Sequence, residues 1–500
     1  MIFKLETGFV LKKFFELKHS LLCALYFLII AGLILPGGYA FAQEDTPQGP
    51  VYIVQDGDSL WNIALRFGVS LEDLQAANNI TNAGQLTLNT PLVIPGLEGV
   101  NGVLTTSRVP LGENLRSLSR RYQIPSETLI RLNHLTSPGE IYAGANLILP
   151  VQETAAGPTR RTVLAPGQSL LELAVLNGTS TWELANTSSL ESRWLALPGD
   201  VLHYPGGAAP GEEQPAGISG ENFNDSPGAL PSLITGISLS PTPLVQGQAA
   251  FIRIDAPPGL QLEGSLAGYD LHFFPDEGGY VAMQGIHAMA EPGMYPLAIS
   301  GTLSAEDGSA SFSFSQNVFV TSGDYVYDPV LTVSPETIDP SITQPEDAQW
   351  LALVQEYTPE KMWDGVFAAP VPPEFAECWP SRFGSRRAYN GSDYRYFHTG
   401  LDFCGGVGTE IYAPADGVVV FAGPLTVRGN ATMIDHGWGV YTGYMHQEEI
   451  LVEPGDRVKA GQVIGLVGAT GRVTGPHLHW EIFVGGVQVD PMEWLEQVFP

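Results

Sequence analysis

The sequence predicts a multidomain protein: three small β-α-α-β repeats, a β-sandwich and a C-terminal domain of mainly antiparallel β-structure. A 55-residue period runs through the N-terminal part, apolar residues alternate with period two in the middle, and short apolar runs between glycine turns fill the C-terminal part. The length of 500 residues suits about three ordinary units. The expected segments are, in chain order, 1–42 (leader), 50–96, 104–151 and 160–206 (repeats), 207–235 (linker), 236–330 (sandwich), 331–375 (connector) and 376–500 (C-terminal domain).

The charge balance disfavours two classes of partner. Asp and Glu number 53 against 23 Lys and Arg, which gives a net charge of −30. Such a surface repels the phosphates of nucleic acids and of anionic lipids. We therefore expect no nucleic acid partner.

The first 42 residues have the pattern of a secretory signal peptide. Four lysines within residues 1–20 precede an apolar run from Leu21 to Leu35, and Ala40-Phe41-Ala42 offers a small-residue cleavage site. We expect cleavage after Ala42 and a protein exported to the cell envelope or the medium. Without cleavage, residues 21–42 would serve as a membrane anchor.

Two cysteines remain in the expected mature chain. Cys378 and Cys404 form an even pair, and an even pair in an exported protein predicts one disulfide. Two separate buried thiols are the alternative.

The N-terminal part contains three copies of a unit of about 45 residues. Gly57-Asp58-Ser59-Leu60 recurs as Gly112-Glu113-Asn114-Leu115 and as Gly167-Gln168-Ser169-Leu170. In the first copy Ser59 and Ser70 each precede an amphipathic helix, and short apolar strands flank the helix pair. This order predicts a β-α-α-β unit.

These units resemble LysM domains. The first copy carries the resemblance through the tetrapeptide at Gly57 and through Tyr52, Ile63-Ala64, Asn78 and Ile94-Pro95. The second copy is recognisable, and the third is degenerate, with Ser188 where the first two have asparagine. The resemblance implies binding of N-acetylglucosamine-containing glycans, chiefly peptidoglycan and chitin. A set of small spacer domains is the alternative.

The middle of the chain has no pattern typical of catalysis. Residues 207–235 are rich in Gly, Pro, Ala, Asp and Glu, which predicts a flexible linker. Residues 236–330 contain alternating runs such as Phe251-Ile252-Arg253-Ile254, which predict an immunoglobulin-like β-sandwich that spaces or orients its neighbours. Residues 331–375 predict a Pro-punctuated connector with one short helix around 346–355.

Five of the ten histidines follow residue 397. His398 and Asp402 are four residues apart, and His477-Leu478-His479 places two imidazoles on one face of a strand, since side-chain direction repeats every two residues. A catalytic zinc takes three protein ligands and keeps one position for water. His398, Asp402 and one histidine of the pair would supply the ligands. The other histidine of the pair and His446 would accept a proton and stabilise an oxyanion. His436 has no spacing partner and is expected to be structural.

Residues 380–495 are similar to the catalytic domain of lysostaphin- and LytM-type zinc endopeptidases. The matching segments are Ser381-Arg382-Phe383-Gly384, His398-Thr399-Gly400-Leu401-Asp402, Asp416-Gly417-Val418-Val419, Asp435-His436-Gly437, Tyr444-Met445-His446, Val458-Lys459-Ala460-Gly461-Gln462-Val463-Ile464-Gly465 and the run from Thr470 to Glu481. The resemblance implies a grooved antiparallel sheet, a Zn²⁺ held by His398, Asp402 and His479, and two catalytic histidines, His446 and His477. It also makes Tyr389 a candidate for oxyanion stabilisation.

The leading functional hypothesis is an exported zinc endopeptidase that cleaves peptidoglycan cross-links or stem peptides and is targeted to the wall by its repeats. The alternatives are a non-catalytic activator of cell-wall amidases and a glycan-binding envelope scaffold. Activators of this type have lost metal ligands, whereas all five positions are filled here. Polyglycine bridges and D-amino acid cross-links both suit such a groove. Residues 376–500 are expected to act independently of the rest.

Overall fold

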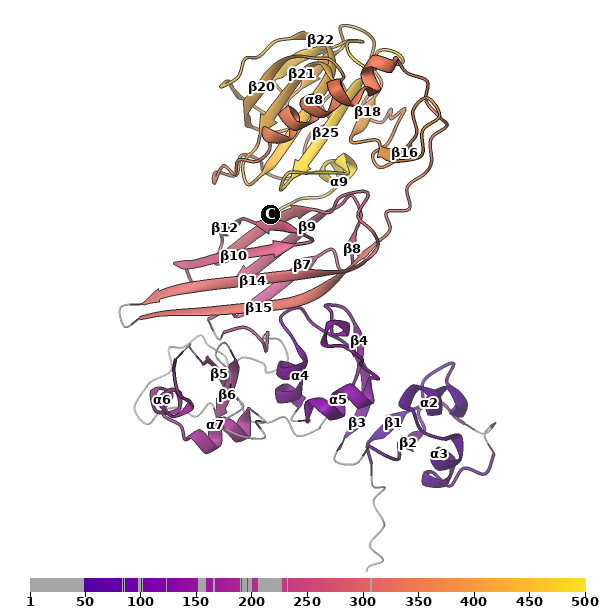
Figure 1. Ribbon diagram of the computed structural model, residues 1–500, viewed down its shortest axis with the longest axis vertical. Coiled ribbons are helices and arrows are strands. Elements are labelled where there is room, and N and C mark those ends of the chain that lie inside the picture. Colours follow the sequence, from indigo (N-terminus) through magenta and orange to yellow (C-terminus); the bar gives the residue numbers. More distant parts are fainter. Residues whose placement is uncertain are drawn as a thin grey trace, which may run out of the picture.

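The computed structural model of the chain (Figure 1) describes residues 49–500. Within that range the description has gaps at 83, 85, 98–99, 101, 123, 152–158, 165–166, 189, 191–195, 197–199, 206–226, 232 and 306–307. The expected signal peptide and most of the expected linker thus lie outside the described residues. None of the helices in the described part is both long and apolar enough to span a bilayer.

Three N-terminal units each consist of a strand, two helices and a closing strand. The elements are β1 (Val51–Ile53), α2 (Leu60–Phe67), α3 (Leu71–Ala77) and β2 (Pro91–Val93); β3 (Val103–Arg108), α4 (Leu115–Tyr122), α5 (Ser126–Leu132) and β4 (Asn146–Val151); and β5 (Thr159–Val163), α6 (Leu170–Leu176), α7 (Thr181–Thr187) and β6 (Val201–Pro205). Ser59 and Ser70 accept hydrogen bonds from the backbone N–H groups of Asn62 and Asp73, as their sequence positions predict.

One recurring polar residue closes each unit. The amide group of Asn78 donates to the carbonyls of Leu74 and Val93, and its oxygen accepts from the N–H of Val93. Asn133 makes the equivalent contacts in the second unit. In the third, the Ser188 hydroxyl binds both backbone groups of His203. The shorter side chain therefore keeps the link between second helix and closing strand.

The first two repeats are not separate domains. The first two share one sheet of order β2-β1-β3-β4, in which β1 and β3 run parallel, whereas β5 and β6 pair with each other. The second repeat also contacts the next domain, since the N–H of Gly112 donates to Gln316 and the N–H of Ala143 to the carbonyl of Asn317. The first two repeats therefore form one continuous sheet, and the second is tied directly to the following domain.

Residues 236–321 form two β-sheets that enclose a common apolar core. One sheet has the order β11-β10-β14-β15-β8 and the other β12-β13-β9-β7. The strands are β7 (Gly236–Ser240), β8 (Leu244–Val245), β9 (Ala249–Asp255), β10 (Leu260–Leu266), β11 (Tyr269–Leu271), β12 (Phe273–Asp276), β13 (Gly279–Gly285), β14 (Gly293–Ala305) and β15 (Gly308–Thr321).

The core of this sandwich corrects the prediction for the linker. Leu230 and Ile234, within the segment expected to be flexible, are fully buried in the core. The average composition of 207–235 is polar and does not indicate these two apolar residues, whose burial holds the C-terminal end of the segment against the sandwich. The second repeat and the sandwich are therefore in direct contact, and the two halves are not mechanically independent.

The C-terminal domain is built on a nine-stranded sheet with the central order β18-β25-β22-β21-β20-β23. Its elements are β16 (Arg386–Arg387), β17 (Tyr396–Phe397), β18 (Leu401–Phe403), β19 (Glu410–Tyr412), β20 (Gly417–Leu425), β21 (Gly429–Asp435), β22 (Val440–Ile450), β23 (Arg457–Val458), β24 (Val463–Val467), β25 (Leu478–Val484), β26 (Val487–Val489) and α9 (Pro491–Glu496). Neighbouring strands of the sheet pair antiparallel, which confirms the predicted class.

The connector belongs to the packing of this domain. Helix α8 (Pro340–Ala352) begins six residues earlier than expected, capped by Asp339, and lies on the large sheet (Figure 1). Trp363, Phe367 and Val371 are buried in the core of the C-terminal domain. The sequence-based boundary at residue 376 is therefore too late. Prolines punctuate this segment, but its aromatic residues fix it to the domain.

The sandwich and the C-terminal domain share that core. Figure 1 places the sandwich between the repeats and the C-terminal domain. Phe274 of β12 stacks on Trp438 with ring centroids 5.4 Å apart, and Phe251 stacks on Phe499 at 4.7 Å. The sandwich is thus packed directly against the C-terminal domain.

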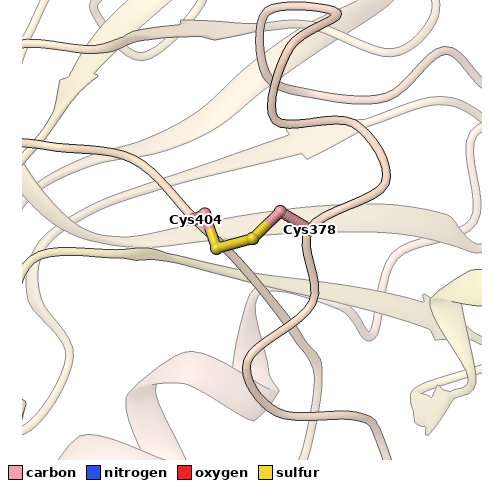
Figure 2. Close-up of a disulfide and its surroundings, with 2 residues drawn as sticks. All are labelled: Cys378 and Cys404. Carbon is pink, nitrogen blue, oxygen red and sulfur yellow. A yellow bond between two sulfur atoms is a disulfide. The ribbon is translucent and has the colours of Figure 1, made fainter.

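The predicted disulfide is confirmed. Cys378 and Cys404 are bonded across a sequence separation of 26 residues, with their Cα atoms 5.5 Å apart (Figure 2). Cys404 directly follows β18, and the N–H of Cys404 donates to the carbonyl of Cys378. The bond therefore fastens the segment before Ser381 to the strand that carries Asp402.

Candidate active site

Antiparallel pairing brings the predicted ligands together. Strand β18 pairs with β25 so that Asp402 lies directly opposite His479, and His398 precedes β18 by three residues. The Nε2 atom of His398 lies 3.0 Å from Asp402 Oδ1 and 2.9 Å from His479 Nδ1, and these last two atoms are 2.8 Å apart. All three side chains are buried.

Outer contacts orient both imidazoles. The Nδ1 atom of His398 lies 2.9 Å from the carbonyl oxygen of Arg382, which only accepts, so this nitrogen carries the proton. The Nε2 atom of His479 faces a carboxylate oxygen of Glu481 at 3.4 Å and donates to it. In its neutral form each ring therefore directs the lone pair of its other nitrogen at the other two ligand atoms.

This donor set fits a zinc ion. The ligand atoms of His398, Asp402 and His479 lie within 4.8 Å of one another. Two imidazole nitrogens and one carboxylate oxygen are typical of catalytic zinc. A carbonyl or carboxylate behind each imidazole is also typical of such sites.

The electrostatics of the cluster favour a cation. Burial alone would raise the pKa of Asp402, but His398 and His479 hold that pKa well below its usual value. Burial alone would lower the pKa of His479, but hydrogen bonds to Asp402 and Glu481 raise it to about 9. Protons and a metal ion therefore compete for His479.

Two further histidines flank the cluster. The ring of His446, on β22, lies 5.0 Å from that of His477 and 6.0 Å from that of His479. Its backbone φ of 64° is unusual for a non-glycine residue and lies beside a register shift in β22. That bulge turns the side chain of His446 toward the cluster.

Both flanking imidazoles have a fixed tautomer. The Nδ1 of His446 donates to the carbonyl of Thr470 at 2.8 Å, and the Nδ1 of His477 donates to the carbonyl of Gly475 at 2.9 Å. Burial and the neighbouring His479 and His477 lower the pKa of His446 to about 3. His446 is therefore neutral at pH 7, with Nε2 as an acceptor.

The cluster opens into a groove of about 900 Å³ with walls from three parts of the chain. His287 and Met289 come from the sandwich, Leu331 and Val333 from the connector, and Tyr389 from the C-terminal domain. The guanidinium carbon of Arg472 lies 4.8 Å from the ring centroid of Tyr389. The structure thus brings together all five predicted site residues and places Tyr389 in the same groove.

His436 has a different environment. Its Nδ1 binds the carbonyl of Asp416 and its Nε2 binds the hydroxyl of Thr442. Burial lowers its pKa to about 4. Both ring nitrogens are engaged, in agreement with a structural role.

Sequence reasoning missed two polar neighbours of the cluster. Glu481 follows His479 by two residues on the same strand, so period two could have found it. Trp350 donates its indole N–H to Glu481 at 2.9 Å from a position 131 residues earlier. No local pattern indicates that contact.

Two family models match parts of this chain. The model of peptidase family M23 matches residues 396–491, and the LysM domain model matches 52–95 and 108–150. The third repeat lies outside the matched residues.

Similar proteins share the C-terminal part. Peptidoglycan DD-endopeptidase ShyA of Vibrio cholerae serotype O1 is 44% identical over 113 residues, 23% of this chain and 26% of the relative. DD-carboxypeptidase/endopeptidase Mpg of Neisseria meningitidis serogroup B is 47% identical over 95 residues, 19% of this chain and 22% of the relative. The chain thus spans about a quarter of the length of these relatives. The structure of lysostaphin from Staphylococcus simulans aligns at 29% identity over 26% of this chain and 54% of that one, with a TM-score of 0.22. By the two family models, the chain carries LysM domains followed by a C-terminal domain of peptidase family M23.

Proposed function

We propose that this protein is an exported, zinc-dependent peptidoglycan endopeptidase. The observation that carries the proposal is the convergence of three ligand atoms, 2.8 to 3.0 Å apart, with two further histidines at the floor of one groove. The filled ligand set favours an enzyme over a non-catalytic activator or a scaffold.

In this proposal His398, Asp402 and His479 hold the zinc ion. A zinc ion held there would act as a Lewis acid, which would polarise the scissile carbonyl and lower the pKa of water. His446 and His477 share the remaining tasks, which are to accept a proton from the attacking water and to stabilise the negative charge on the carbonyl oxygen. The Nδ1 of His446 donates to the carbonyl of Thr470, which leaves Nε2 as the acceptor and supports this role.

We propose a cross-link between D-amino acids as the substrate, in preference to polyglycine. The printed names of two relatives, a DD-endopeptidase and a DD-carboxypeptidase/endopeptidase, support this choice. The LysM repeats would bind the glycan of the same polymer and keep the groove near its peptides. The third repeat, which keeps the fold and the closing contact of Ser188, would be a further such unit. The two packed sheets of 236–321 support an immunoglobulin-like assignment.

Two measurements on the purified protein test the proposal. Elemental analysis should find about one zinc ion per chain. Mass spectrometry of the fragments that the protein releases from peptidoglycan sacculi should show cleavage at one type of bond. His479→Ala should lose most zinc and all cleavage, because a ligand is gone. His446→Ala should keep zinc and lose cleavage.

The controls separate the alternatives. His134→Ala changes an exposed histidine of the second repeat and should leave zinc content and cleavage unchanged. Full zinc occupancy in His479→Ala would refute the ligand assignment. Zinc binding without cleavage of any sacculi would favour the activator or scaffold.

A further inference from the structure

We infer that helix α8, upstream of the residues matched by the M23 model, positions the metal ligand His479 through a hydrogen bond from Trp350 to Glu481. The inference rests on the proposed function, because it takes His479 as a zinc ligand. Trp350 lies behind the groove and does not line it, so we regard it as a positioning residue.

A single buried carboxylate connects the helix to the ligand. The indole N–H of Trp350 donates to Oε2 of Glu481 at 2.9 Å. The other oxygen, Oε1, faces Nε2 of His479 at 3.4 Å. Trp350 and Glu481 are both almost completely inaccessible to solvent. Because each oxygen has its own partner, the carboxylate plane is fixed, and with it the direction of the imidazole.

The sheet is shaped to admit the indole at this place. Gly443 on β22 lies directly opposite Glu481 on β25. A Cβ atom at Gly443 would lie 2.7 Å from Cζ2 of Trp350. Any other residue at 443 would therefore push the indole away from Glu481. The close approach of α8 depends on this glycine.

A second contact fastens the same helix to the other side of the site. Glu346, one turn before Trp350, accepts hydrogen bonds from the N–H groups of Val427 and Arg428 at 2.9 and 3.0 Å. The guanidinium of Arg428 binds Glu346 and lies 5.3 Å from the ring centroid of Trp350. The carbonyl of Arg428 accepts the backbone N–H of His446. Helix α8 thus supports both the ligand strand and the strand of His446.

Loss of the indole N–H should weaken the metal site more than the fold. Without that donor, Oε2 of Glu481 remains buried with one partner fewer, which favours rotation of the carboxylate. His479 then loses its fixed orientation. Residues that form a hydrogen bond to a metal ligand typically contribute 10- to 100-fold to metal affinity. Trp350 is one hydrogen bond further from the ligand, so we expect its loss to weaken zinc affinity about tenfold.

The test compares two tryptophans in the full-length protein. Trp350→Phe removes the N–H donor. Trp494→Phe is the matched control, because Trp494 is equally buried and its Nε1 has no hydrogen-bond partner among the described residues. Zinc affinity is measured by competition with a chelator at 25 °C, and the melting temperature of the metal-free protein is measured alongside. Replacement of each tryptophan by benzothienylalanine, in which sulfur takes the place of N–H, repeats the comparison with no change in ring size.

The outcomes are distinct. We expect both changes at 350 to weaken zinc binding about tenfold, whereas the changes at 494 leave zinc affinity within about twofold of the wild type. Equal zinc affinity of the benzothienylalanine proteins and the wild type would overturn the inference and leave the proposed function intact. A wild-type protein that binds no zinc would overturn both.

Discussion

Replacement of Phe274 by alanine should destabilise the C-terminal domain, although this residue belongs to the sandwich. Phe274 is 7% exposed and stacks on Trp438 at 5.4 Å with an interplanar angle of 8°. Trp363 contacts the same indole edge-on. The three rings come from the sandwich, the turn between β21 and β22, and the connector, so removal of one leaves a cavity that no single part can close.

The magnitude follows from the burial of the ring. Truncation of a buried phenylalanine to alanine typically costs about 3–5 kcal/mol. For a unit of this size, 1 kcal/mol corresponds to roughly 2–4 °C in melting temperature. Phe274→Ala should therefore lower the melting temperature of the sandwich and C-terminal domain together by roughly 6–20 °C.

Calorimetry and hydrogen exchange measure this effect in complementary ways. Scanning calorimetry should show one shared transition that moves as a whole, and amide exchange in β25 should become faster in the variant. Phe67→Ala is the control, because Phe67 is buried in the first repeat and should leave that transition unchanged. Protection of β25 that is the same in Phe274→Ala and in the wild type would refute the idea of a shared core.

The remaining predictions concern single contacts. Serine at both Cys378 and Cys404 should lower the free energy of unfolding by about 3.5 kcal/mol, the chain-entropy value for a loop of 26 residues. Denaturant titrations of the variant and of the wild type measure this loss, and equal stability of the two proteins without reductant would contradict it. Burial and the charge of Asp490 raise the pKa of Glu493 from 4.5 to about 8. The folded state therefore binds the proton more tightly, and this contribution to stability is full below pH 4.5 and falls as pH rises to 8, by ~5 kcal/mol at most. Glu493→Gln should remove that slope in unfolding curves, and a persisting slope would exclude Glu493 as its cause. Asn78→Ala should destabilise the first repeat by about 1–3 kcal/mol, because the buried N–H of Val93 loses its acceptor. The loss would be measured as faster amide exchange in that repeat. Asn78→Ser, which copies the third repeat, should destabilise it less, and an equal loss in both variants would count against the contact.

Patterns with short periods were predictable from the sequence. Serine caps and period-two runs are local, because backbone geometry ties them to neighbours a few residues away. The 55-residue repeat is visible by comparison of the sequence with itself. The pair at His477 and His479 belongs to this class. So does the carboxylate of Glu481, which the same period places beside His479.

The boundaries between domains were less predictable, because composition averages over a segment while packing depends on individual side chains. Leu230 and Ile234 fix a segment that is polar and glycine-rich on average. Trp363 and Phe367 fix a segment rich in proline. One buried aromatic ring outweighs many solvated neighbours in free energy.

The sequence by itself determined the candidate metal-binding residues, the repeat units and the cysteine pair, since each needs only residue type, spacing or a family motif. Only the tertiary structure decided that the groove has walls from three parts of the chain and that Trp350 lies behind His479. The contact between Trp350 and Glu481, for example, joins residues 131 positions apart. Such contacts arise when strands pair and cores merge, and at such separations the position of a residue along the chain does not constrain its neighbours in space.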